Sequence, residues 1–271
     1  QKIEKDRYIE TVKKIKGHIQ RGDIYEMNYC QEFYAEKPVI DPVNIFWKIN
    51  SRNPAPFSGF YKNKDKYLLS ASPERFLKKS GKKIISQPMK GTIKRGKCPE
   101  EDEKLKKDLQ NNPKEQAENV MIVDLVRNDL SKTAGKGSVA VEELYGIYTF
   151  PYVHQMVSTV VSQIRDDIKF TDVIKHAFPM GSMTGAPKIR AMELIDSYES
   201  IRRNLFSGSL GYISPGQDFD FNVVIRSILY NSSNQYFSIT TGGAITAQSD
   251  PEKEYEESLL KANSLIKILK N

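Results

Sequence analysis

Two pairs of glutamates are the first residues whose type and spacing could do chemistry. Glu115 and Glu118 lie three positions apart, and Glu254 and Glu257 repeat that spacing near the C-terminus. Residues three apart share one face of a helix, so each pair would present two carboxylates together. Carboxylates with few histidines nearby suit Mg²⁺, which takes one or two carboxylates and keeps positions for water and substrate. Acidic residues also favour helix N-terminal turns, so the spacing alone leaves both interpretations open.

A lysine and a glutamate form a second candidate site. Lys90 stands in PMKGT, directly before a Gly-Thr pair, and Glu74 stands sixteen positions earlier in SPERF. The ordinary interpretation of such a lysine is a solvated side chain in a turn. Pro88, which interrupts the strand-like residues before it, is consistent with that interpretation.

Two glycine-bearing segments could present backbone amides to an anion. GSMTGAPK, residues 181–188, runs into a predicted helix, where N–H groups can hold an anion, although its spacing is not that of a Walker loop. TTGGAIT, residues 240–246, resembles a second small-residue turn. Arg226 ends an alternating run and could pair with a carboxylate, and His154 is one of three histidines. Each of these features also has an ordinary structural interpretation.

Composition limits the class of protein. The chain has 271 residues, 39% of them hydrophobic, and a net charge of +7, which suits either an anionic ligand or ordinary solubility. Its two cysteines, Cys30 and Cys98, allow no disulfide framework, so we expect a reducing, cytoplasmic location. We see no apolar run of the ~18 residues that a membrane helix needs, no signal peptide and no aromatic-interleaved basic patch for nucleic acid.

Periodicity indicates the elements that must position these residues. Helices are predicted over residues 4–21, 44–50, 101–111, 113–130, 171–177, 187–199 and 251–269. Antiparallel strands are predicted over residues 24–36 and 138–164, and in FSGFYKN, KYLLSAS, ERFLKKS, KKIISQP, SGSLGYISP, FDFNVVIRSILYN and QYFSITTGGAITA. Because helices occur in groups between these strands, we expect one α+β domain over residues 1–271.

Longer motifs occur in one order along the chain: SPERF, PMKGT, EQAENVMIVDLVRNDL, PYVHQMVS, FPMGSMTGAPKIRAMELI, RRNLFSGSLGY, FNVVIRS and SDPEKEYEESLLKA. Together they resemble the chorismate-utilising enzymes, which include the anthranilate, aminodeoxychorismate, isochorismate and salicylate synthases. The resemblance implies a large α/β sandwich of two antiparallel sheets with outer helices. It also implies that this chain is the chorismate-binding catalytic portion, without the N-terminal segment of longer relatives.

Lys90 selects a branch of this family. Anthranilate and isochorismate synthases typically carry alanine in the matching position, whereas the aminodeoxychorismate branch (component I) carries lysine. The RRN at 202–204 also resembles that branch. The resemblance therefore implies conversion of chorismate and ammonia to 4-amino-4-deoxychorismate, on the way to 4-aminobenzoate and folate, with ammonia supplied by a separate glutamine amidotransferase subunit.

The resemblance also assigns roles to individual residues. It implies that Glu74 is the general acid for the departing C4 hydroxyl, that Lys90 is the nucleophile at C2, and that His154 lies near the ring carboxylate. Burial should raise the pKa of Glu74 for that task. Glu118 and Glu257 would carry Mg²⁺, with Glu115 and Glu254 ligating directly or through water. The implied substrate contacts are Arg226 and Lys261 with the pyruvyl carboxylate, the amides at Gly242, Thr184 and Gly185, and the aromatic wall of Phe206.

Two departures and two alternatives accompany this assignment. The glycine-rich turn usually reads G-x-G in the family and has Ala244 in place of the second glycine here, and Phe206 stands where relatives commonly have tyrosine or tryptophan. One alternative is anthranilate synthase component I, against which Lys90 argues. The other is a non-catalytic anion or nucleic-acid binder, against which the glutamate pairs argue because they would repel phosphate.

Overall fold

The computed structural model describes residues 1–38, 40–52 and 54–270, and these residues form two compact units. The first unit comprises Gln1–Pro73, Met183–Leu210 and Val223–Asn271, and the second comprises Glu74–Ser182 and Gly211–Asn222. Each unit is built around one antiparallel sheet. The chain therefore alternates between the units, and neither unit is one continuous stretch of sequence.

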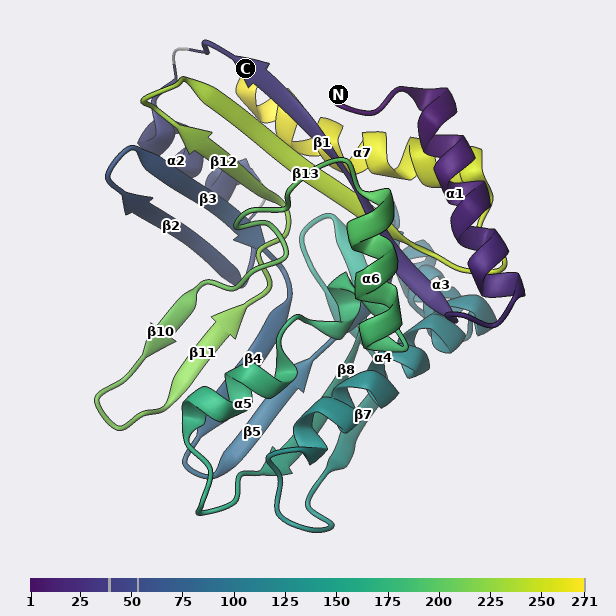
Figure 1. Ribbon diagram of the computed structural model, residues 1–271, viewed down its shortest axis with the longest axis vertical. Coiled ribbons are helices and arrows are strands. Elements are labelled where there is room, and N and C mark those ends of the chain that lie inside the picture. The colour runs from purple at the N-terminus through teal and green to yellow at the C-terminus, as the bar shows by residue number, and fades with distance from the viewer. Residues whose placement is uncertain (39, 53, 271) are drawn as a thin grey trace. The chain divides into compact units, whose positions relative to one another are not determined.

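The sheet of the first unit has the strand order β2-β3-β12-β13-β1-β9. Its strands are β1 (Glu26–Glu36), β2 (Phe57–Asn63), β3 (Lys66–Ser72), β9 (Gly185–Ala186), β12 (Ser227–Asn231) and β13 (Tyr236–Ile245). The long strands β1 and β13 run side by side, and α7 packs against β13 (Figure 1). The helices of this unit are α1 (Lys5–Gln20), α2 (Pro42–Arg52), α6 (Lys188–Tyr198) and α7 (Pro251–Lys270).

Helix α1 shows why these elements form where they do. Tyr8, Val12 and Ile15 recur at helical spacing and are fully buried, so the helix presents one apolar stripe to the core. The Tyr8 ring lies 5.0 Å from the ring of Tyr29 on β1 and 5.4 Å from that of Tyr255 on α7, measured between centroids. One helix face thus packs against both the central strand β1 and the helix α7, which carries candidate site residues.

The sheet of the second unit has the order β10-β11-β4-β5-β8-β6, and β7 also pairs with β8. Its strands are β4 (Arg75–Ser80), β5 (Lys83–Gln87), β6 (Met89–Lys94), β7 (Ala140–Thr149), β8 (Val153–Gln163), β10 (Gly211–Ile213) and β11 (Phe219–Asn222). Helices α3 (Pro99–Gln110), α4 (Pro113–Ser131) and α5 (Phe170–Ala177) complete the unit, followed by the short 3₁₀ helix η1 (Gly181–Met183). Helix α4 packs against β6 and β8.

The predicted α+β class with two antiparallel sheets is confirmed, and the predicted helices lie close to the observed ones. One strand prediction was wrong, and the structure decides two local alternatives. The run FDFNVVIRSILYN is not one strand, because the chain leaves one sheet at Asn222 and enters the other at Ser227. The glycines of TTGGAIT lie within β13, in line with the strand predicted over QYFSITTGGAITA and not with a turn, and Lys90 lies in strand β6 and not in the turn of its ordinary interpretation.

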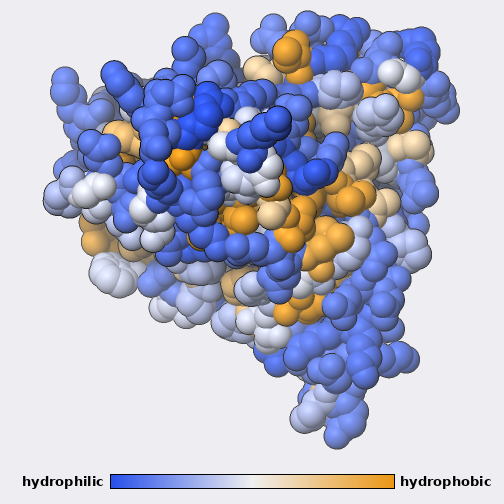
Figure 2. All heavy atoms as spheres, turned by 90° about the horizontal axis from the view of Figure 1, so that it is seen from below, coloured by the Kyte–Doolittle hydropathy of each residue, from blue (hydrophilic) through white to orange (hydrophobic). Residues whose placement is uncertain are grey.

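The surface agrees with the charged composition. Hydrophilic side chains cover most of the face in Figure 2. Within the described residues, no helix combines the length and the apolar character that crossing a membrane requires.

Candidate active site

Glu74 stands directly before β4 and is buried, with 5% of its surface exposed. The Ser182 hydroxyl donates a hydrogen bond of 2.7 Å to its Oε1 atom. Burial raises the pKa of Glu74 to about 7, against the opposing effects of the Ser182 bond, the positive charge of Lys90 and a backbone hydrogen bond from Met89. A carboxyl group with that pKa is available in its protonated form near neutral pH, as a general acid must be.

Lys90 lies on a β-bulge in the second unit, the same unit as Glu74. Met89 pairs with Val157 and Thr92 with Gln155, so Lys90 and Gly91 together stand opposite one residue of β8. Gly91 has a φ of 92°, a left-handed conformation that suits glycine. Bulges of this kind re-aim a side chain and are frequent next to active sites. The half-buried lysine is thus held close enough for its charge to act on Glu74.

The first glutamate pair lies at the start of α4, close to this bulge. Asn112 caps the helix by accepting hydrogen bonds from the amides of Lys114 and Glu115, at 3.0 and 3.3 Å. The Glu115 Oε2 atom lies only 3.0 Å from where a Cβ on Gly91 would stand. Glu118 is half-buried and 3.7 Å from the ammonium of Lys114. The structure therefore brings Glu115 against the strand that carries the candidate nucleophile.

The second glutamate pair lies on α7 in the first unit. Glu254 is buried, and its Oε1 atom accepts a 2.7 Å hydrogen bond from the Ser249 hydroxyl. Glu257 forms an ion pair of 2.8 Å with Lys261, one turn later. The Lys261 ammonium also donates a 2.8 Å hydrogen bond to the carbonyl of Gly242. One face of α7 thus carries two carboxylates and a lysine, of which Glu254 is buried near Gly243 and Lys261 binds β13, while Glu257 is exposed.

These carboxylates fit a hard cation in their chemistry. They offer oxygen ligands only, which suits Mg²⁺ better than zinc or copper. Glu254 is buried beside a second carboxylate one turn away, an arrangement that a cation would stabilise. Within the described residues, however, no group of three or more His, Cys, Asp or Glu side chains is arranged to hold a metal ion. The two pairs belong to different units, so the four-glutamate magnesium site stays a prediction.

The remaining predicted substrate contacts lie in the first unit. Arg226 is half-buried with a φ of 48°, a conformation that is costly for a residue with a side chain. Burial also lowers its pKa. Gly242 pairs with Cys30 across the sheet, and a Cβ there would approach the Cys30 Sγ atom to 2.5 Å. Thr184 and Phe206 are buried.

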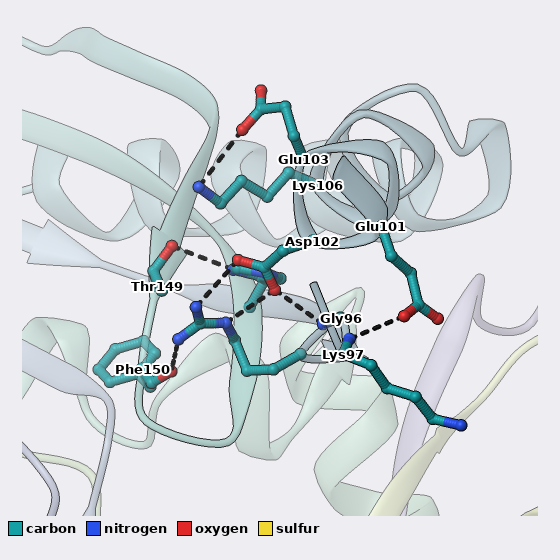
Figure 3. Close-up of polar contacts among 10 residues, drawn as sticks. Gly96, Lys97, Glu101, Asp102, Glu103, Lys106, Thr149 and Phe150 are labelled. Atoms are coloured by element: carbon teal, nitrogen blue, oxygen red, sulfur yellow. Dashed lines mark hydrogen bonds and ion pairs between the residues drawn. The ribbon is translucent and has the colours of Figure 1, made fainter. Parts of the chain in front are cut away.

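His154 lies inside a hydrogen-bonded cluster in the second unit, and its side chain is fully buried. Its Nε2 atom lies 2.8 Å from the Asp102 carboxylate and its Nδ1 atom 3.0 Å from the Thr149 hydroxyl. Asp102 lies at the centre of the cluster in Figure 3, where it also accepts from the Gly96 amide and from Arg95. The Arg95 guanidinium holds the pKa of Asp102 well below its usual range. Both ring nitrogens of His154 are therefore engaged, and its direct catalytic role stays a prediction.

Comparison with known proteins identifies the family. The chorismate binding enzyme family matches residues 1–267. The chain belongs to the chorismate binding enzymes. It is 40% identical over 265 residues to aminodeoxychorismate synthase component 1 of Escherichia coli, covering 98% of this chain and 58% of that protein. It is 42% identical over 268 residues to the probable chloroplastic aminodeoxychorismate synthase of Oryza sativa, covering 98% of this chain and 30% of that protein.

A solved member of the family has the same fold. The crystal structure of anthranilate synthase component I from Streptococcus pneumoniae matches with a TM-score of 0.89 and 30% identity, over 97% of this chain and 58% of that one. The chain therefore spans little more than half the length of these bacterial relatives. The predicted family and the predicted fold are both confirmed.

Sequence reasoning missed three residues at this family site. Ser182 was part of the GSMTGAPK motif, but no local pattern indicates that its hydroxyl reaches Glu74, 108 positions away. Asp102 stood in an acidic run that reads as a solvated helix face, although its side chain is largely buried and binds His154. Arg95 follows Lys90 closely in sequence but is paired with Asp102. Each of these contacts depends on tertiary packing.

Proposed function

We propose that this chain is the chorismate-converting part of an aminodeoxychorismate synthase, component I. It would form 4-amino-4-deoxychorismate from chorismate and ammonia, for 4-aminobenzoate and folate synthesis. The observation that carries the proposal is Lys90 on its bulge, in the same unit as a buried Glu74 whose pKa is raised to about 7. The names of the relatives from Escherichia coli and Oryza sativa support the same activity.

In the proposed reaction the two residues act in sequence. The neutral Lys90 amine attacks C2 of chorismate, the ring double bonds shift, and the C4–O bond breaks while Glu74 donates its proton, so that water leaves. Ammonia then attacks C4, the double bonds shift back, and the bond from C2 to the lysine nitrogen breaks. The surplus proton on the new amine returns to the Glu74 carboxylate, which restores the enzyme.

We also propose the ligand contacts of this reaction. Glu118 and Glu257 would carry Mg²⁺, with Glu115 and Glu254 ligating directly or through water. When bound, the ion would neutralise the carboxylates that face the ring carboxylate of the substrate. Arg226 and Lys261 would bind the pyruvyl carboxylate, and the amides of Gly242, Thr184 and Gly185 would bind anionic oxygens. The aromatic wall would come from Phe206.

The ammonia would come from a glutamine amidotransferase subunit. The Escherichia coli relative is named a component 1, which supports an enzyme of more than one part. The thiol of Cys30 is buried in a central strand, and burial raises its pKa, so it does not suit the nucleophile of a glutaminase. The two free cysteines also support a reducing, cytoplasmic location.

The second candidate function is that of anthranilate synthase component I, which the solved relative from Streptococcus pneumoniae favours. Mass spectrometry of the product decides between them. The protein is incubated with chorismate, Mg²⁺ and ammonium, and the product is compared with 4-amino-4-deoxychorismate and anthranilate standards. We expect the former. Anthranilate or isochorismate as the main product would overturn the proposal, and salt-dependent DNA retention without turnover would indicate a binder instead.

A further inference from the structure

A buried ion pair in the first unit is not used by the proposed chemistry. Arg203 and Glu199 lie one turn apart after α6, and their side chains are 15% and 3% exposed. The contact is bidentate, with the Arg203 Nε atom 2.8 Å from Glu199 Oε2 and the Nη2 atom 2.7 Å from Oε1. Such fork-to-fork pairs fix geometry as well as charge. The further contacts of this buried pair show which parts of the backbone it holds in place.

Besides a local 3.3 Å hydrogen bond from Arg203 Nη1 to the Ser207 hydroxyl, the pair makes hydrogen bonds to backbone groups from distant parts of the sequence. Arg203 donates through Nη1 to the carbonyl of Met183 at 2.6 Å, and through Nη2 to the carbonyl of Asn28 at 3.2 Å. Glu199 accepts a 2.9 Å hydrogen bond from the amide of Cys30. The pair therefore ties the segment that enters β9 to the central strand β1.

This tie and the pairing of β1 with β9 together set the direction of two backbone amides. Arg203 holds the Met183 carbonyl, and the Asn28 amide donates 2.7 Å to the carbonyl of Thr184. Across a trans peptide bond the carbonyl and the next N–H point in opposite directions. With both carbonyls turned toward β1 and the ion pair, the N–H groups of Thr184 and Gly185 are turned the other way. These are the two amides proposed to bind an anionic oxygen of the substrate.

Gly185 leaves this segment little freedom to adopt another path. Its φ is 151°, and a Cβ there would stand 2.2 Å from the carbonyl oxygen of Glu26 on β1. The backbone of the segment thus lies directly on the strand. The same ion pair also holds the amide of Cys30, the residue of β1 that stands opposite Gly242 in β13.

We propose that Arg203 and Glu199 are positioning residues, which orient the Thr184 and Gly185 amides toward the substrate without touching it. This inference rests on the proposed function for the identity of the anion. It predicts that arginine and lysine are not interchangeable at position 203, because an ammonium lacks the planar fork that spans Glu199, Met183 and Asn28 at once.

Arg203→Lys tests the inference, with Arg202→Lys as the matched control, because Arg202 is the adjacent arginine and is exposed. We expect the KM for chorismate to rise about tenfold or more in Arg203→Lys, with kcat little changed, because the amides contribute binding that is uniform along the reaction. A merely structural role would lower the active fraction, and hence apparent kcat, at constant KM. An unchanged KM in folded Arg203→Lys would overturn the proposal.

A second measurement needs no turnover and no knowledge of the product. Hydrogen exchange of the peptide that contains Thr184 and Gly185 should be faster in Arg203→Lys than in the wild type. Added chorismate should protect this peptide in the wild type and much less in the variant. If Arg203→Lys does not fold, Glu199→Gln, which keeps the shape and removes the charge, replaces it in both measurements. Protection by chorismate that is equal in the folded variant and the wild type would sink the inference, whichever product the enzyme makes.

Discussion

Replacing Glu74 by glutamine should stabilise the folded protein in a pH-dependent way while abolishing turnover. The pKa of Glu74 is raised from 4.5 to about 7, chiefly by burial. Because the folded state disfavours the charged form, ionisation in the unfolded state destabilises the fold as the pH rises from about 4.5 to about 7. At about 1.4 kcal/mol per pKa unit, the accumulated cost is about 3 kcal/mol above pH 7.

Glutamine is a suitable probe because its carbonyl oxygen can still accept the hydrogen bond from Ser182. The free energy of unfolding should therefore exceed that of the wild type by up to about 3 kcal/mol at pH 8, and by much less at pH 5. Urea unfolding at both pH values measures this difference. Glu103→Gln is the control, because that glutamate is exposed on α3 in the same unit.

An increase in the free energy of unfolding that does not depend on pH, or no increase at all, would refute the reasoning. An equal gain at pH 5 and pH 8 would mean that glutamine merely packs better than glutamate. No gain at pH 8 would mean that the carboxylate is as well solvated in the folded protein as in water, and Glu74 would then have no reason to stay protonated near neutral pH. In either case its role as general acid would lose its physical basis.

Three further predictions concern the same site. Ser182→Ala removes a hydrogen bond that lowers the pKa of Glu74, so the alkaline limb of the pH profile of kcat/KM should move to higher pH by roughly one unit. The profile is measured at a constant concentration of free ammonia, and an alkaline limb at the wild-type pH would contradict the prediction. Lys90→Ala should lower kcat by roughly a hundredfold or more, and an unchanged kcat in this variant would refute a nucleophilic role. When wild-type protein is incubated with chorismate but no ammonia and then quenched, the peptide that contains Lys90 should gain the mass of chorismate less one water. Glu118→Ala and Glu257→Ala should abolish turnover with the fold intact by circular dichroism, whereas full wild-type activity in excess chelator would rule out the metal.

The elements of this fold could be predicted because they rest on local periodicity. The buried stripe of α1, the Asn-Pro start of α4 and the alternating runs of β2 and β3 are visible within a few residues. The position of Lys90 on a bulge was harder to predict, because a bulge is defined by the pairing of β6 with its partner strand β8. The break at Arg226 was not predictable either, since nothing in an alternating apolar run indicates a left-handed arginine.

The candidate site could be predicted in its residues but not in its connections. The motifs that resemble the family contain Glu74, Lys90 and the glutamate pairs, yet the contacts that tune them cross large sequence separations. His154 and Asp102 lie 52 positions apart, and Ser182 lies 108 positions from Glu74. Such pairs depend on which strands become neighbours, a property of the whole topology.

The alternation of the chain between its two units has a consequence for its synthesis. Strand β1 ends at Glu36, and its long partner β13 begins 200 positions later, at Tyr236. At about 5–20 residues per second, a ribosome needs roughly 10–40 s to cover that distance. Until β9 (Gly185–Ala186) has been made, β1, whose first eight residues are buried in the finished fold, has neither β9 nor β13 beside it. Its unpaired edges are a ready template for other chains, so the nascent protein depends on staying dilute or shielded until its last third has been made.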